Sequence, residues 1–148
     1  KIFILKDQIE KLEKLKSIPI ISISVFLLKS QLVEFELKHT IFILDLHLNE
    51  YFPSATLKRH VRTPNEFNNH TFRKLFFEMN QFEGKALDGL KNRLGRLVDL
   101  RDNFTHHLFS SEKDIEQLII DAGKGIVIAN ETLKILEIIN RELKISKS

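Results

Sequence analysis

The sequence contains no cysteine and no tryptophan, and it has only three prolines, five glycines and one tyrosine among its 148 residues. The absence of cysteine excludes a disulfide framework, a cysteine-ligated zinc site and thiol catalysis. A protein without cysteine fits most simply in a reducing cytosol, so we expect a cytoplasmic location. The scarcity of glycine and proline argues against a loop-rich or low-complexity chain.

Long hydrophobic runs are also missing. The longest uncharged stretch, residues 17–28, is well short of the ~20 apolar residues that a membrane-spanning helix needs. Hydrophobic residues make up 43% of the chain and charged residues 29%, which is typical of a globular protein. We therefore expect one soluble domain over residues 1–148, with no membrane partner. The net charge of +3 permits an anionic partner without demanding one.

Apolar residues recur at helical spacing along nearly the whole chain, whereas the alternation typical of strands is hard to find. We therefore predict an all-α fold, a compact bundle of four or five helices with short connections. The expected helices cover residues 2–16, about 20–51, 64–82, from 85 toward 104, and about 114–142, and the main loop covers residues 53–62.

Several residues mark the ends of these helices. Thr63, Pro64 and Glu66 form a capping box that predicts the start of the third helix, and Glu83 with Gly84 should end it. Ser111 and Asp114 should cap the last helix. The sequence Gly123-Lys124-Gly125 lacks the ending of a phosphate-binding loop and lies in an apolar helical pattern, so we expect a close helix approach or a kink there.

The helix over residues 20–51 carries two apolar stripes, which predicts two buried faces. It is either the central helix of the bundle or part of a dimer interface. His39 lies on one of these stripes and is expected to be a core or interface histidine.

A charged residue interrupts the apolar stripe of the helix that begins at Lys85. The apolar members of this stripe are Leu87, Leu90, Leu94, Leu97, Val98, Phe104 and Leu108. Arg101 lies among them, and a guanidinium on an apolar seam needs an anion to offset the cost of leaving water. The anion is either a carboxylate such as Glu34, Glu36 or Asp45, or a phosphate reached across an interface.

The residues around Arg101 read Leu97-Val98-Asp99-Leu100-Arg101-Asp102-Asn103-Phe104-Thr105-His106-His107-Leu108-Phe109. This string resembles the signature of the HEPN superfamily (higher eukaryotes and prokaryotes nucleotide-binding), in which an Arg, usually followed by Asn, Asp or His, precedes a His by four to six residues. Arg101, Asp102 and His106 match at the four-residue spacing, and His107 would match at five. The resemblance implies a bundle of four or five helices that dimerises with this motif at the interface.

The resemblance implies a ribonuclease, and the chemistry of the two side chains suits that activity. Cleavage of RNA by its own 2′-hydroxyl needs a base, an acid and a cation to stabilise charge on the phosphorane. Histidine titrates near neutral pH and can act as base or acid, whereas arginine stays charged and grips phosphate oxygens. We therefore expect metal-independent cleavage with no cofactor, by Arg101 and His106, with Asp102 or Asn103 orienting the histidine or the phosphate.

Geometry favours a site made by two chains. On an unbroken helix, residues five apart point about 140° away from each other. Arg101 and His106 could therefore meet only if the helix breaks near Asn103 or if a partner chain supplies one of them. The resemblance implies the second arrangement, in a homodimer.

The remaining polar residues give weaker signals. Adjacent His106 and His107 diverge on a helix, and no HxxxH spacing is present, so we expect no metal site. The basic cluster from Lys58 to Arg62 in the main loop either guides RNA into the site or is simply a solvated loop. The residues assigned to RNA binding are Lys58, Arg59, Arg62 and Arg96.

Three functions remain open from the sequence. The first is a HEPN-type endoribonuclease acting as a toxin or in phage defence, with a possible antitoxin protein as partner. The second is a non-catalytic HEPN-like module that binds a nucleotide or joins a dimer, and the third is a helical adaptor in which Arg101 forms a buried ion pair.

Many toxin-like members of the HEPN superfamily carry a tyrosine two residues after the motif histidine, where a partner nucleotidyltransferase modifies it. This chain has Leu108 there, and its only tyrosine is Tyr51, which departs from that pairing.

Overall fold

The computed structural model describes residues 2–13, 21–51, 63–110 and 115–145, with only the backbone described at residues 12, 13, 49–51, 108–110 and 145. The described residues are helical and contain no strand, which confirms the all-α prediction. The elements are α1 (Ile2–Glu13), α2 (Ile21–Tyr51), a short 3₁₀ turn η1 (Pro64–Phe67), α3 (Phe72–Met79), α4 (Lys85–Ser110) and α5 (Ile115–Ile145). None of the helices, over the described ranges, is both long and apolar enough to cross a membrane.

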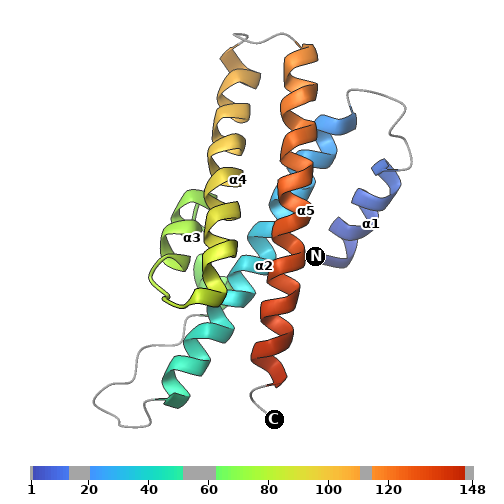
Figure 1. Ribbon diagram of the computed structural model, residues 1–148. Coiled ribbons are helices and arrows are strands. Elements are labelled where there is room, and N and C mark those ends of the chain that lie inside the picture. The colour runs from blue at the N-terminus through green and yellow to red at the C-terminus, as the bar shows by residue number, and fades with distance from the viewer. Residues whose placement is uncertain (1, 14–20, 52–62, 111–114, 146–148) are drawn as a thin grey trace.

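The helix α2 is the centre of the bundle. It contacts α1, η1, α3, α4 and α5, so every other described element packs on it (Figure 1). Its two predicted apolar stripes are covered differently. The stripe through Phe26, Val33, Leu37 and Ile41 is fully buried, whereas on the second stripe α1 covers only the part around Leu32.

His39 lies on the second stripe of α2, where the sequence predicts a core or an interface histidine; the core option is wrong, and the interface option stays a prediction. Its side chain is exposed. The short helix α1 packs on the earlier turns of this stripe through Leu5 and Ile9 and covers Leu32. Further along the stripe, His39 borders a pocket beside the start of α1 instead of the core.

The helices α2 and α5 run in the same direction, and polar contacts connect them along their length. Lys29 Nζ donates to Asn130 Oδ1 at 2.5 Å, and Thr40 Oγ1 donates to Asn140 Oδ1 at 2.8 Å. Near their ends, His47 Nε2 lies 2.8 Å from the carbonyl oxygen of Leu143. These paired contacts satisfy polar groups that the α2/α5 contact would otherwise desolvate.

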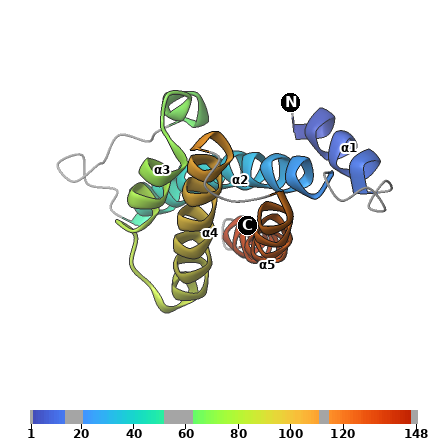
Figure 2. The ribbon, with the colours of Figure 1, turned by 90° about the horizontal axis from the view of Figure 1, so that it is seen from above.

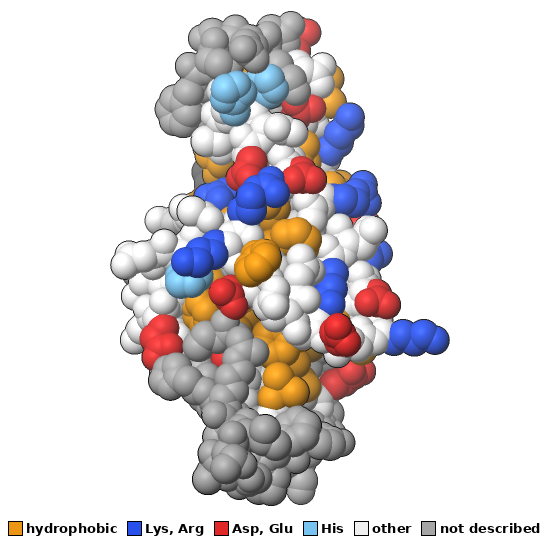
Figure 3. All heavy atoms as spheres, turned by 90° about the vertical axis from the view of Figure 1, so that its left-hand side faces the viewer, with side chains coloured by type: hydrophobic (Ala, Val, Ile, Leu, Met, Phe, Trp, Pro, Cys, Tyr) orange, Lys and Arg blue, Asp and Glu red, His pale blue; other side chains and the backbone are white. Residues whose placement is uncertain are grey.

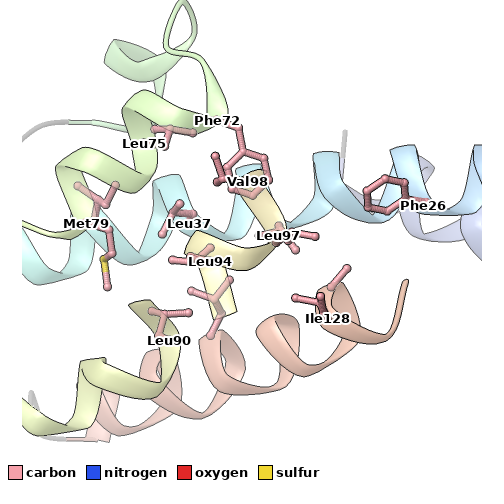
Figure 4. Close-up of a cluster of buried hydrophobic side chains, with 14 of the residues drawn as sticks. Phe26, Leu37, Phe72, Leu75, Met79, Leu90, Leu94, Leu97, Val98 and Ile128 are labelled. Carbon is pink, nitrogen blue, oxygen red and sulfur yellow. The ribbon is translucent and has the colours of Figure 1, made fainter. Parts of the chain in front are cut away.

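The inward stripe of α4 forms much of the core, as the sequence predicts. Its members Leu87, Leu90, Leu94, Leu97, Val98 and Phe104 are all buried. Figure 4 shows how four elements meet there, with residues from α4 facing residues of α2, α3 and α5. The labelled members are Phe26, Leu37, Phe72, Leu75, Met79, Leu90, Leu94, Leu97, Val98 and Ile128.

The third predicted helix differs from the structure. Instead of one helix over residues 64–82, the chain forms η1, breaks, and restarts as α3, where Thr71 Oγ1 accepts a hydrogen bond from the backbone N–H of Lys74. Thr63 makes no side-chain capping bond. Phe67 and Phe72 are both buried, and five residues apart on one α-helix they would point about 140° apart. The break allows both rings to reach the core.

The predicted break at Gly84 is present, whereas the last two helices extend beyond their predicted ends. Gly84 separates α3 from α4 with a φ of 152°, a value that residues with a side chain rarely adopt. The helix α4 continues past Phe104 to Ser110, and α5 ends at Ile145. The predicted caps of the last helix, Ser111 and Asp114, lie outside the described residues.

Candidate functional site

The motif residues all lie on α4, which is helical without interruption from Lys85 to Ser110. The helix does not break near Asn103, so Arg101 and His106 point about 140° away from each other in one chain. Arg101 faces α2 and α3, whereas His106 lies on the outer face of the helix and is exposed. A single copy of the chain therefore does not bring these two side chains together.

Arg101 is partly buried at the junction of α2, α3 and α4. Its Nη1 lies 3.1 Å from Oε1 of Glu34 on α2, and its guanidinium carbon lies 5.6 Å from the centre of the Phe72 ring. The side chains of Arg101 and Glu34 are 29% and 18% exposed. Glu34 is thus the carboxylate that the apolar seam requires, one of the three acids suggested by the sequence.

The ion pair leaves hydrogen-bonding atoms of both side chains without a hydrogen-bond partner among the described residues. Glu34 Oε1 is buried, and its geometry toward Arg101 does not meet the criteria of a hydrogen bond, so the contact is an electrostatic one. Among the described residues, no hydrogen bond engages the other N–H groups of Arg101. A guanidinium presents five donors, and a partly exposed one can still bind phosphate oxygens.

Burial raises the pKa of the Glu34 carboxyl above its ordinary value of 4.5, because the charged form loses its hydration. The positive charges of Arg101 and Lys38 lower it and offset part of this rise. Glu34 therefore binds a proton more readily in the folded chain than in the unfolded one.

We expect the stability cost of Arg101→Ala to grow with pH. Without Arg101, the pKa of Glu34 rises further, and the folded state then loses stability as the pH climbs from about 4.5 toward neutrality. Near neutral pH the cost should be on the order of 1–3 kcal/mol, below the 3–5 kcal/mol for a fully buried pair. Urea denaturation of both proteins across this pH range measures it.

The matched control for this titration is the same substitution in a Glu34→Gln background. There the cost of Arg101→Ala should be smaller and independent of pH, because no carboxylate remains to be stranded. A cost that is equal at acidic and neutral pH in the original background would contradict the role assigned to Glu34.

His106 and His107 lie side by side at the end of α4. Their ring centres are 5.5 Å apart with the planes at 65°. His106 is exposed, and no described residue forms a hydrogen bond with its imidazole, whereas His107 is half-buried and has contacts of its own. The imidazole of His106 is therefore more accessible to a substrate than the imidazole of His107.

Asp102 contributes to the attachment of α3 to α4. Arg73 on α3 places its Nη2 2.9 Å from Asp99 and also 2.9 Å from Asp102, and its Nε donates to Asp102 at 3.0 Å. All three side chains are largely exposed, so the bridge contributes little to stability, about 0–1 kcal/mol. Arg73 is not among the residues predicted from the sequence, where the signal for this bridge is two acids three residues apart on one helical face.

Asn103 lies on a different side of α4, in a groove of about 570 Å³ between α4 and α5. Arg96 and Lys124 line the same groove, together with the acids Asp99 and Glu131. Of the residues assigned to RNA binding, Arg96 is thus placed near a motif residue. Lys58, Arg59 and Arg62 lie outside the described residues.

The surface over α3 and α4 is not uniformly basic. Figure 3 shows lysine and arginine side chains interspersed with acidic ones, a hydrophobic patch between them, and histidines near the end of α4. Within the described ranges, no group of three His, Asp or Glu side chains is arranged to hold a metal ion. The motif places a partly buried cation, Arg101, an exposed imidazole, His106, and a half-buried one, His107, on α4.

Comparison of the chain with protein-family models, with curated proteins and with solved structures gave no match.

Proposed function

We propose that this chain is a metal-independent endoribonuclease of the HEPN type, active as a homodimer. The observation that carries the proposal is the placement of the motif on one unbroken helix. Arg101 is held by Glu34 with N–H groups to spare, and His106 stands exposed on the outer face. Two copies of such a helix, packed against each other, offer a way for the arginine of one to meet the histidine of the other.

The proposed reaction uses the substrate's own nucleophile. A histidine takes the proton of the RNA 2′-hydroxyl, the freed oxygen attacks the adjacent phosphorus, and the bond to the 5′-oxygen breaks. A water molecule supplies the proton to that leaving oxygen. Arg101 stabilises the negative charge of the phosphorane. The products are a 2′,3′-cyclic phosphate and a 5′-hydroxyl end.

The apolar surface that supports dimerisation lies on α5. The exposed fractions of Ile120, Val127 and Ile138 are about half, and these side chains recur along one face of that helix. The sequence leaves α2 as either the central helix of the bundle or part of a dimer interface, and α2 contacts all the other described elements of the bundle. A dimer should therefore use α5 and the motif end of α4.

The biological role of such a nuclease is proposed from the resemblance alone. RNA cleavage in a toxin–antitoxin pair or in phage defence would fit it, with an antitoxin protein as the partner. Leu108 stands where many toxin-like members carry the tyrosine modified by their antitoxin. We therefore propose an antitoxin that acts by binding.

The experiment that tests the proposal is incubation of the purified protein with total RNA in the presence of EDTA. Cleavage should persist, and the fragments should carry 2′,3′-cyclic phosphate ends. Sedimentation should give a dimer at micromolar concentration. A monomer of 17.3 kDa with no nuclease activity would contradict the proposal.

The alternative function is a non-catalytic HEPN-like module or helical adaptor. The ion pair of Arg101 and Glu34 favours it, because the pair alone already satisfies the need of the apolar seam for an anion. Under this alternative, Arg101→Ala lowers stability, and the wild-type protein leaves RNA intact.

A further inference from the structure

A pocket of about 430 Å³ lies between the start of α1, the middle of α2 and η1. Figure 2 shows the start of α1 and the green segment before α3 on one side of α2, with α5 on the other. The pocket is therefore remote from the groove between α4 and α5. The lining side chains that matter here are Phe3, Phe35, Lys38, His39, Asn65 and Asn68.

The aromatic side chains of this pocket are poorly covered. Phe3 is 89% exposed, although it lies on a helix whose next turn buries Leu5 and Ile9 in the bundle. Phe35 is half-buried, and Lys38 Nζ lies 5.4 Å from the centre of its ring. The exposed ring of Phe3 therefore provides a stacking surface in a pocket that also contains Lys38, whose side chain is largely buried at 8% exposed.

The charges of the pocket favour an anion. Lys38 and His39 line it, and the described residues that line it include no Asp or Glu. The groove between α4 and α5, in contrast, carries equal numbers of acids and bases. The exposed side-chain amides of Asn65 and Asn68 add donors and acceptors at the rim of the pocket.

A flat aromatic group, hydrogen-bonding edges and a phosphate are the features of a nucleotide. Proteins bind single-stranded nucleic acid by stacking bases on aromatic side chains while cations follow the backbone. Side-chain amides can bond to the edges of an unpaired base. The lining of this pocket supplies each of these contacts.

The pocket is connected to the motif arginine through α2, which carries both Lys38 and Glu34. Lys38 is one helical turn along α2 from Glu34, and its charge acts on that carboxyl together with the charge of Arg101. The two cations therefore flank Glu34. An RNA strand with one nucleotide in the pocket would lead toward Arg101.

We propose that this pocket holds one unpaired nucleotide of the RNA substrate, with its base on Phe3 and its phosphate toward Lys38 and His39. The identity of the ligand as RNA rests on the proposed function. The pocket would give the enzyme a preference for single-stranded over duplex RNA, because a paired base cannot leave its stack to enter.

Binding can be measured apart from cleavage. A fluorescein-labelled, single-stranded 2′-O-methyl oligoribonucleotide lacks the 2′-hydroxyl that attacks the phosphorus, so it stays intact on the wild-type protein. Fluorescence anisotropy should show that Phe3→Ala weakens its binding by about tenfold, the value expected for one lost base stack. Phe77→Ala is the matched control, because Phe77 is 62% exposed on α3, away from the pocket. It should leave binding unchanged.

A second pair of variants tests the charge of the pocket. Asn65→Asp places a carboxylate at its rim and should weaken binding several-fold, more at low salt than at high salt. Asn92→Asp makes the same change on the exposed face of α4 and should have no effect. Thermal denaturation of all four variants should match the wild type, since each substituted side chain is exposed.

The outcomes separate this inference from the proposed function. If the wild-type protein binds the oligonucleotide and neither Phe3→Ala nor Asn65→Asp weakens that binding, the proposed nucleotide pocket is wrong. It is also wrong if the wild-type protein does not bind the oligonucleotide at all. Pocket-dependent binding without cleavage of unmodified RNA overturns only the nuclease. A duplex oligonucleotide bound as tightly as the single strand also contradicts the pocket.

Discussion

Arg101→Ala and His106→Ala should each reduce RNA cleavage in EDTA by about 10²–10³-fold or more. Arg101 is expected to lose its stabilisation of the phosphorane, and His106 the transfer of a proton. The two variants should differ in stability. His106 is exposed and makes no hydrogen bond to the described residues, so its removal should leave the melting temperature unchanged, whereas Arg101→Ala strands the carboxylate of Glu34.

The neighbouring histidine provides the control for this result. His107→Ala is the same change one residue later, at a half-buried position, and should affect cleavage less than His106→Ala. If His107→Ala proves the more damaging, the five-residue spacing is the operative one. Loss of cleavage accompanied by unfolding in His106→Ala would remove the evidence for a catalytic role.

Gly125→Ala should destabilise the fold by about 1–3 kcal/mol, although alanine is the better helix former. A Cβ atom at Gly125 would lie 2.3 Å from Cε1 and 2.5 Å from Cδ1 of Phe26. Phe26 is fully buried and meets Phe104 edge-on, with ring centres 5.2 Å apart, so it cannot turn aside. The added methyl group would force α5 away from α2.

Gly123 provides a matched control on the same helix. A Cβ there meets nothing within 4 Å, so Gly123→Ala should stabilise the protein by about 0.5–1 kcal/mol through helix propensity alone. Urea denaturation of both variants measures the difference. Equal effects of the two substitutions would contradict the close contact of α5 with Phe26.

Much of the fold follows from periodicity. The inward stripe of α4 is correct at every position whose side chain the structure describes, because a long amphipathic helix has only one face to bury. The close approach at Gly125 was expected as one of two options, a contact or a kink. The sequence predicts an anion beside Arg101, either a carboxylate such as Glu34, Glu36 or Asp45 or a phosphate, and the structure places Glu34 there.

The errors have a common origin in tertiary context. Whether His39 is covered depends on how far α1 extends over α2, and the sequence of α2 does not contain that information. The break before α3 lets Phe67 and Phe72 both reach the core, and Thr71, which caps α3, is a local signal that the stronger capping pattern at Thr63 outweighed. The bridge from Arg73 to Asp99 and Asp102 joins helices whose relative placement sequence patterns leave open.

The measurement that tests the two-chain site most directly is to mix the two inactive variants. Arg101→Ala and His106→Ala subunits, unfolded together and refolded at equal concentrations, form some mixed dimers. In a mixed dimer, one of the two sites has an intact arginine from one subunit and an intact histidine from the other. Cleavage in EDTA should therefore return to roughly a quarter of the wild-type rate, since about half of the dimers are mixed and each has one working site. A mixture as inactive as its two components would contradict a catalytic site shared between subunits.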